Sequence, residues 1–136
     1  MKPWSFLLAI AFAIFAPGCA DPLYRKSIRV SIGSSLCLPF ARLAGWPDDL
    51  RVLRESGHVI LALTPRARAI DITEFGTTRP VPERLALLVG AEGIGLSAAA
   101  LDAADHEVKI AMAPGADSLN VATACGIALH RLTPSS

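Results

Sequence analysis

Short apolar runs alternate along this chain with segments whose apolar residues recur at helical spacing. The runs predict strands at 12–16, 58–63, 85–89 and 108–112, and a shorter one at 35–40 that is closed by Pro39. Helical spacing and flanking signals predict helices at 48–56, 98–104 and 118–132. Residues 66–82 are expected to be loop, with room for a short strand at 69–72. Strands that alternate with helices indicate an α/β fold with a mostly parallel sheet flanked by helices.

The first twenty residues fit two interpretations. Lys2, the apolar run at 5–16 and the small residues before Cys19 resemble a secretory or lipoprotein signal peptide. The run is too short to predict a transmembrane helix. Buried parallel strands are also continuous apolar runs, so hydropathy does not separate the two. The alternatives are therefore an exported lipoprotein anchored at Cys19 and a strand at 12–16 followed by a turn that contains Cys19.

Two glycine-punctuated blocks near the end of the chain carry the strongest functional signal. They are LLVGAEGIGLS at 87–97 and MAPGADSLNV at 112–121. Each places a loop between an apolar strand and a helix, where open α/β sheets bind ligands. Taken singly, each block is explained by turns and helix caps, with Ser97 as one N-cap, Asp117 and Ser118 as others, and Asn120 in a first turn. Their joint residue types and order are more specific than turn chemistry requires.

Together the blocks resemble the second and third motifs of the SpoU (TrmH-type) branch of the SPOUT RNA methyltransferases. Residues 17–33 are similar to the family's P-x-x-A-D-P turn, basic helix and S-x-G ending, and the resemblance spans about residues 12–132. This match favours the strand interpretation of 12–16 and a cytoplasmic protein. The fold that it implies is a SPOUT-type α/β knot, with a deep trefoil knot near the C-terminus of a single domain over 1–136.

The resemblance also implies an activity, a cofactor and site residues. Members of the family transfer a methyl group from S-adenosylmethionine to a ribose 2′-hydroxyl of tRNA or rRNA, and they form homodimers. Here the dimer contact is expected on the apolar face of 121–132. The matching positions imply catalytic roles for Glu92, Ser118 and Asn120, and RNA contacts by Arg25, Lys26 and Arg29. They imply cofactor contacts at Leu88, Gly90, Ile110, Met112 and Leu119.

One family motif has no counterpart in this chain. The first motif, roughly N-x-G-x-x-x-R, carries an arginine assigned to the hydroxyl proton or the nearby phosphate, yet no arginine precedes Arg25 and no asparagine precedes Asn120. The expectation is thus an N-terminally truncated domain that lacks its first strand and first motif. Two alternatives follow. The chain is either a truncated or mis-started copy of an active enzyme, or a remnant that binds cofactor and RNA without efficient turnover.

Composition adds limits rather than a function. A chain of 136 residues with 52% apolar and 18% charged residues is long enough for one globular core and too short for two. Residues 1–84 hold 11 Lys and Arg against 7 Asp and Glu, whereas residues 85–136 hold 2 against 5. A polyanion along the basic half and ordinary surface charge both explain this asymmetry. Cys19, Cys37 and Cys125 show no disulfide or metal-ligand spacing, so no metal is expected and the pattern fits a reducing compartment. The family resemblance implies RNA as the partner, and neither DNA nor a membrane.

Overall fold

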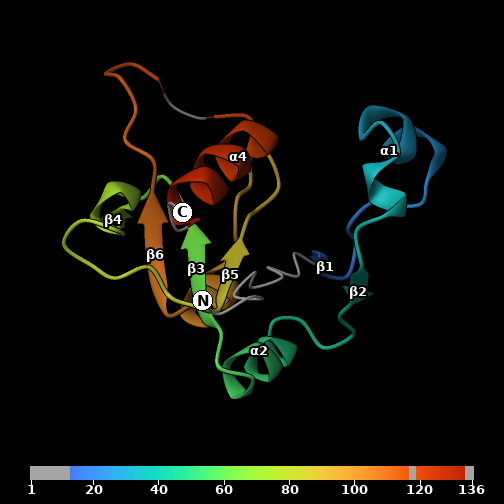
Figure 1. Ribbon diagram of the computed structural model, residues 1–136, viewed down its shortest axis with the longest axis horizontal. Coiled ribbons are helices and arrows are strands. Elements are labelled where there is room, and N and C mark those ends of the chain that lie inside the picture. Colours follow the sequence, from blue (N-terminus) through green and yellow to red (C-terminus); the bar gives the residue numbers. More distant parts are fainter. Residues whose placement is uncertain (1–12, 117–118, 134–136) are drawn as a thin grey trace, which may run out of the picture. The chain divides into compact units, whose positions relative to one another are not determined.

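The computed structural model describes residues 13–116 and 119–133 (Figure 1). The chain folds as two compact units, Met1–Trp46 and Pro47–Ser136. In the part of the chain that is described, no helix has both the length and the apolar character needed to span a membrane.

The first unit contains a two-stranded parallel ladder and a short basic helix. Its elements are β1 (Ala13–Phe15), α1 (Arg25–Val30), the 3-10 turn η1 (Ser34–Leu36) and β2 (Phe40–Arg42). Strand β1 pairs with β2 from Ala13 opposite Phe40 to Phe15 opposite Arg42. The rings of Phe15 and Phe40 meet edge to face with centroids 5.9 Å apart. The predicted strand at 12–16 is confirmed over its described residues.

The strand predicted at 35–40 is wrong. Residues Ser34–Leu36 form the turn η1, and β2 begins at Phe40, where the prediction ended. Proline lacks an N–H group, but its carbonyl still accepts hydrogen bonds. The Pro39 carbonyl accepts from the backbone N–H of Ala13 at 2.9 Å. Pro39 therefore opens the ladder instead of closing it.

Helix α1 ends in a Schellman motif with an unusual residue. The N–H of Gly33 donates to the Ile28 carbonyl at 2.9 Å, and the N–H of Ile32 donates to the Arg29 carbonyl at 3.2 Å. This geometry places Ile32 in the left-handed region at φ 52°. Glycine normally occupies that position, because a side chain there costs about 1–2 kcal/mol and β-branched residues suit it least. Ile32 is also 94% exposed, so packing gives little in return.

We expect Ile32→Gly to stabilise the end of α1 by about 0.5–1 kcal/mol, because relief of the left-handed strain exceeds the added backbone entropy. The measurement is hydrogen exchange of the Gly33 amide, whose bond to Ile28 closes the helix. Ile32→Ala is the matched control, since it removes the branched side chain and keeps a Cβ. Equal stabilisation by the two variants would show that the backbone conformation is not the source of the strain.

The second unit is built on a four-stranded, all-parallel sheet in the order β4-β6-β3-β5. Strand β3 pairs with β5 from Val59 opposite Leu85 to Ala62 opposite Leu88, and it pairs with β6 on its other side. The predicted parallel α/β sheet is confirmed. The elements of this unit are η2 (Asp48–Leu50), α2 (Arg51–Glu55), β3 (Val59–Leu63), β4 (Ile70–Asp71), η3 (Ile72–Glu74), β5 (Leu85–Leu88), α3 (Ala98–Asp102), β6 (His106–Lys109) and α4 (Val121–Leu132).

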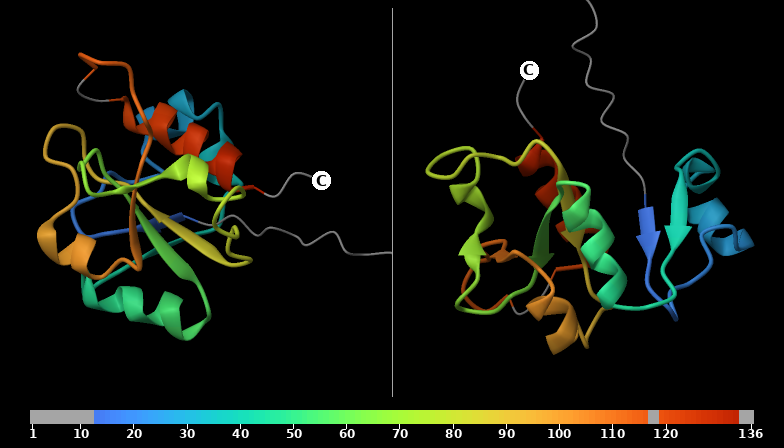
Figure 2. Two further views of the ribbon diagram at one scale, coloured as in Figure 1. Left: turned by 90° about the vertical axis from the view of Figure 1, so that its left-hand side faces the viewer. Right: turned by 90° about the horizontal axis from the view of Figure 1, so that it is seen from below.

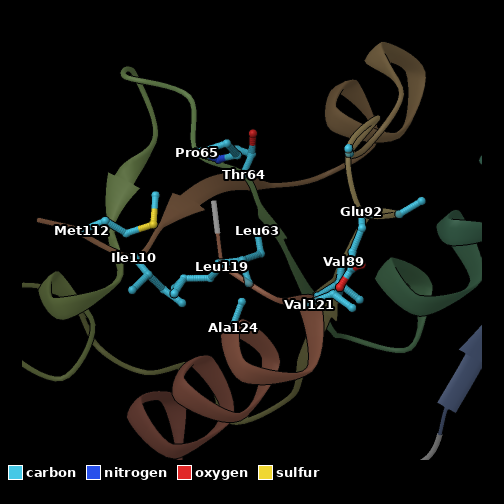
Figure 3. Close-up of a pocket in the computed structure, with 14 residues that line it drawn as sticks. Leu63, Thr64, Pro65, Val89, Glu92, Ile110, Met112, Leu119, Val121 and Ala124 are labelled. Carbon is cyan, nitrogen blue, oxygen red and sulfur yellow. The ribbon is translucent and has the colours of Figure 1, made fainter. Parts of the chain in front are cut away.

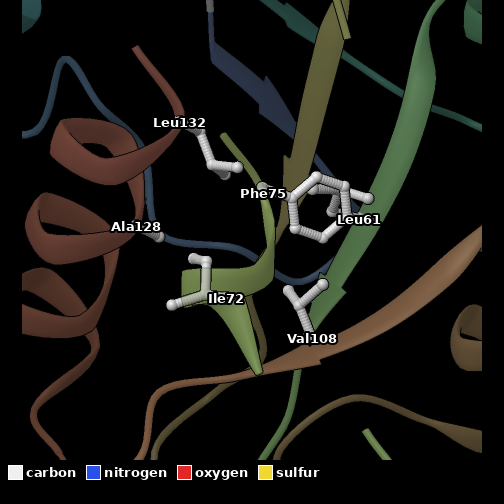
Figure 4. Packing of buried hydrophobic residues seen from close by; sticks show 6 residues of the cluster. All are labelled: Leu61, Ile72, Phe75, Val108, Ala128 and Leu132. Atoms are coloured by element: carbon white, nitrogen blue, oxygen red, sulfur yellow. The ribbon is translucent and has the colours of Figure 1, made fainter. Parts of the chain in front are cut away.

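Both faces of this sheet are covered. Helix α4 lies on one face and α3 on the other (Figure 2). Ile60, Leu61 and Ala62 in the central strand β3 are 0% exposed, as expected where successive side chains point to opposite, covered faces. The core cluster under α4 joins the sheet to η3 and to the last turns of the helix (Figure 4). Its buried members are Leu61, Ile72, Phe75, Val108, Ala128 and Leu132.

Several boundaries in this unit differ from prediction. The strand expected at 108–112 lies at His106–Lys109, because its last pairing joins Lys109 to Asp71 and the chain then leaves the sheet. The helix expected at 118–132 begins at Val121, with Asn120 as its N-cap rather than in its first turn. Residues 117–118, where we expected the cap, lie outside the described residues. The predicted Ser97 cap is confirmed, since its hydroxyl accepts from the Ala100 N–H at 3.2 Å.

Candidate functional site

A pocket of about 360 Å³ opens where the carboxyl ends of β3, β5 and β6 meet the start of α4 (Figure 3). In open parallel sheets this edge is where ligands bind. The two glycine-punctuated blocks supply most of its wall, and the end of β3 supplies the rest. The lining residues are Leu63, Thr64, Pro65, Val89, Gly90, Ala91, Glu92, Gly93, Gly95, Ile110, Met112, Leu119, Val121 and Ala124.

Apolar residues line both sides of the pocket, and one side also carries the charged Glu92. Ile110 and Met112 lie on one side, Val89 and Glu92 on the opposite side, and Leu119 between them (Figure 3). Val89 and Leu119 are 40% and 38% exposed although both are large apolar residues. Apolar surface that opens into a concave site marks a ligand-binding surface more often than a packing defect.

The glycine segment 90–95 forms a tight, closed loop beside the pocket. The Gly95 N–H donates to the Ala91 carbonyl at 2.8 Å. The backbone of Gly90 packs directly on that of Gly95 and Leu96, so closely that a Cβ on Gly90 would lie 2.3 Å from the Gly95 carbonyl carbon. Glycine here serves close backbone approach. The loop thus brings main-chain groups to the edge of the pocket, together with the Glu92 side chain.

Asn120 links this loop to helix α4. Its Oδ1 accepts from the backbone N–H groups of Ala122 at 3.0 Å and Thr123 at 3.3 Å, which satisfies two of the free donors of the first helical turn. Its Nδ2 donates to Glu92 Oε1 at 2.8 Å. One amide side chain therefore fixes the helix start and Glu92, the one acidic side chain among the described residues of the pocket lining.

The structure brings together most of the residues predicted for the cofactor and catalytic sites. Gly90, Glu92, Ile110, Met112 and Leu119 line the pocket, and Asn120 reaches it through Glu92. Leu88 is not among the lining residues, because it is buried in the sheet at 7% exposure opposite Ala62. Ser118 lies outside the described residues.

Sequence reasoning missed the contributions of β3 and of helix α4. Thr64 and Pro65 come directly after the apolar run of β3, and parallel neighbouring strands end at the same sheet edge. The position of Thr64 and Pro65 directly after an apolar run was the available signal. It indicates a pocket residue only when β3 is known to lie next to β5 and β6 in the sheet. Val121 and Ala124 belong to the predicted apolar face of the helix, and part of that face lines the pocket instead of the core.

The three basic residues predicted to contact RNA lie together on α1 in the first unit. Arg25, Lys26 and Arg29 are exposed and, with Tyr24, line a shallow hollow of about 280 Å³. The first turn of α1 contains no acidic residue. The helix therefore presents positive charge next to an exposed aromatic ring.

The parallel sheet, the glycine loop and the pocket at the strand ends define an α/β protein with a small-molecule site. The chain belongs to the SpoU rRNA methylase family, whose model matches residues 6–130. It is 50% identical over 128 residues to an uncharacterized tRNA/rRNA methyltransferase of Mycobacterium tuberculosis, a match that covers 94% of this chain and 44% of the relative. It is 31% identical over 120 residues to the 23S rRNA (guanosine-2′-O-)-methyltransferase RlmB of Vibrio cholerae, covering 88% and 47%.

Solved structures give the same result. An AdoMet-bound rRNA methyltransferase from Sinorhizobium meliloti matches with a TM-score of 0.76 and 30% identity, over 88% of this chain and 44% of that one. The SpoU methyltransferase AviRb from Streptomyces viridochromogenes, in complex with AdoMet, matches with a TM-score of 0.73 and 34% identity, over 90% and 49%. The chain thus spans less than half the length of these relatives.

Proposed function

We propose that the pocket binds S-adenosylmethionine and that the chain forms the methyl-transfer part of an RNA 2′-O-methyltransferase acting on tRNA or rRNA. The observation that carries this proposal is the single pocket into which both glycine-punctuated blocks converge. The names of the relatives support the activity, and two of the matched structures hold AdoMet. Such an enzyme works in the cytoplasm, where its RNA substrates are.

The pocket has the size and chemistry that this cofactor needs. Its volume of about 360 Å³ falls in the range of roughly 300–1,000 Å³ that is usual for small-molecule sites. Ile110, Met112 and Leu119 offer apolar surface that suits the faces of an adenine ring. The backbone of the glycine segment offers N–H and C=O groups for polar edges. Glu92 is acidic, and its carboxylate suits a cationic or hydroxyl-bearing group.

Bound S-adenosylmethionine would supply a methyl group on a sulfonium sulfur, which leaves as a neutral thioether. The protein must therefore align the ribose 2′-oxygen with that methyl group and help remove the hydroxyl proton. The hydrogen bond from Asn120 holds the Glu92 carboxylate at the pocket, where it can accept a hydrogen bond or pair with a guanidinium. We assign Glu92, Asn120 and Ser118 to this alignment.

The same proposal includes a homodimer and the trefoil knot of the family. Helix α4 leaves Ile127 41% exposed and Leu129 50% exposed, on opposite flanks of the face that buries Ala124 and Ala128. These exposed aliphatic side chains offer apolar surface for a contact with a second copy. Analytical ultracentrifugation of the chain tests this part of the proposal.

The central test measures cofactor binding and product chemistry separately. Calorimetric titration of the chain with S-adenosylmethionine should show saturable binding at one site. Transfer of a labelled methyl group to tRNA or rRNA, followed by alkaline hydrolysis, should yield labelled alkali-resistant dinucleotides, because a methylated 2′-oxygen cannot attack the adjacent phosphate. Binding without transfer would favour the remnant that lacks turnover, and absence of binding would contradict the proposal as a whole.

RNA binding should depend on the basic face of α1. We expect Arg25→Gln, Lys26→Gln and Arg29→Gln each to weaken RNA binding at low salt, and each lost phosphate contact to reduce the slope of log K against log salt by about 0.7–0.9. The measurement is RNA affinity by filter binding over a salt series. Arg51→Gln, an exposed arginine on α2, is the control and should leave the slope unchanged. An unchanged slope in all three variants would remove α1 from the RNA interface.

A further inference from the structure

The 65–69 loop begins at the pocket wall, where Pro65 lines the pocket, and most of the loop is exposed. It leaves β3 after Thr64, and Pro65 lines the pocket. Residues 65–68 are exposed, and only Ala69 is buried, at 5% exposure. Apolar packing therefore does not account for the conformation of this loop. Its polar contacts with β6 account for it instead.

Glu107 on β6 joins two arginines of the loop. Its Oε1 pairs with Nη1 of Arg66 at 3.6 Å and accepts a hydrogen bond from Nη2 of Arg68. The Glu107 side chain is only 16% exposed, whereas Arg66 and Arg68 are 44% and 67% exposed. The hydrogen bond to Glu107 raises the pKa of the Arg68 guanidinium above its usual value. The loop thus brings two cations to one partly buried anion.

Burying the Glu107 carboxylate costs desolvation free energy, so stabilisation of the fold alone is a poor explanation for this contact. Glu107 Oε2 is buried and has no hydrogen-bond partner among the described residues. Removing a carboxylate from water carries a penalty that its ion pairs often fail to recover, so such a group is weak evidence for added stability. Fixing the geometry of the loop accounts better for its presence.

Lys109 holds the same loop two residues further along β6. Its Nζ donates to the Ala67 carbonyl at 2.8 Å. Glu107 and Lys109 lie on the same side of the strand, because side chains two residues apart share a face. The carbonyl of Val108 between them accepts from the Thr64 N–H at 2.9 Å. Strand β6 therefore contacts the loop at three successive residues, 66, 67 and 68, and also at its origin.

We propose that Glu107 and Lys109 are positioning residues that hold the 65–69 loop, and thereby keep Pro65 in the wall of the cofactor pocket. This inference rests on the proposed function of that pocket. Strand β6 continues directly into Ile110, which also lines the pocket, so one strand sets the spacing of both parts of the wall. Neither side chain lines the pocket itself. The two residues therefore act on binding through the loop and leave the chemical step alone.

Glu107→Gln and, independently, Lys109→Met test the proposal. The Ala69 amide, which donates to the Arg66 carbonyl at 3.0 Å, reports the loop in hydrogen exchange, and the Gly95 amide reports the glycine segment. We expect Ala69 exchange to accelerate about tenfold and Gly95 exchange to stay unchanged, in keeping with loss of a charge-assisted contact. The dissociation constant and KM for S-adenosylmethionine should rise by a similar factor at constant kcat.

Glu74→Gln is the matched control. It makes the same substitution in another glutamate–arginine pair, Glu74 with Arg79 at 3.1 Å, and neither residue lines the pocket. It should change neither Ala69 exchange nor cofactor affinity. If Ala69 exchange is unchanged in both test variants, the two residues do not hold the loop. If it accelerates at constant affinity, the loop is not a binding wall. If the unmodified chain binds no S-adenosylmethionine, the proposed function fails, while the exchange result still decides whether Glu107 and Lys109 hold the loop.

Discussion

Gly90→Ala should lower the affinity for S-adenosylmethionine by about tenfold or more and reduce the free energy of unfolding by about 1–3 kcal/mol. The added Cβ would lie 2.3 Å from the Gly95 carbonyl carbon and 2.5 Å from the Leu96 nitrogen. Both are backbone atoms, so no side-chain rotation can relieve the clash. The glycine segment must move, and the pocket edge moves with it. Calorimetric titration and urea unfolding measure the two effects.

Gly126→Ala is the matched control for this prediction. Gly126 lies in the middle of α4, and a Cβ there meets nothing within 4 Å. Because glycine weakens a helix interior, the alanine variant should be more stable by about 0.5–1 kcal/mol. It should bind the cofactor as the unmodified chain does. A Gly90→Ala variant that behaves in the same way would contradict the close approach on which the shape of the loop depends.

Substitutions at Asn120 should separate its two contacts. Asn120→Ala removes the N-cap and should cost about 0.5–2 kcal/mol of stability. Asn120→Asp keeps an oxygen for the N–H groups of Ala122 and Thr123, and its charge suits a helix N-terminus. The aspartate, however, loses the Nδ2 donor and faces the Glu92 carboxylate. We therefore expect Asn120→Asp to stay close to the unmodified chain in stability and to lose methyl transfer at least as severely as Asn120→Ala.

Thermal unfolding and initial rates of methyl transfer on the two variants decide this point. An Asn120→Asp variant with full activity would limit the residue to helix capping. Loss of activity in proportion to loss of stability in both variants would lead to the same conclusion. Glu92→Gln completes the set, because it keeps the acceptor for Nδ2 and removes only the charge. Its activity shows whether the carboxylate or merely the hydrogen bond is needed.

Local chemistry made much of the site predictable from the sequence. The apolar runs of β3 and β5 are short but uninterrupted, a pattern that predicts buried parallel strands. Gly90 and Glu92 come directly after the apolar run of β5. Their position and residue type therefore predict a loop at the carboxyl end of that strand. Asn120 was expected near the start of a helix because its side chain competes for backbone donors. Each of these inferences depends on neighbours in the sequence.

The errors arise where distant partners decide the structure. The first residues of β6, His106 and Glu107, are polar, so an apolar pattern places the strand two residues late. Glu107 is tolerated there because arginines about forty residues earlier in the chain reach it. A leucine at the end of a strand can line a pocket or pack in the core. Only the pairing of Leu88 with Ala62 in β3 shows that this one packs in the core. Strand order, which hydropathy does not contain, is the missing information.

The strand order also has a consequence for how the chain is made. Strand β6 lies between β3 and β4, yet it is synthesised after the other three strands of this sheet. Until it leaves the ribosome, one edge of β3 and one edge of β4 have unpaired backbone groups, and α4 has not yet emerged to cover the core beside them. A nascent chain stalled before residue 106 therefore carries an open, apolar sheet edge, the kind of surface that chaperones bind and that aggregates when they are scarce.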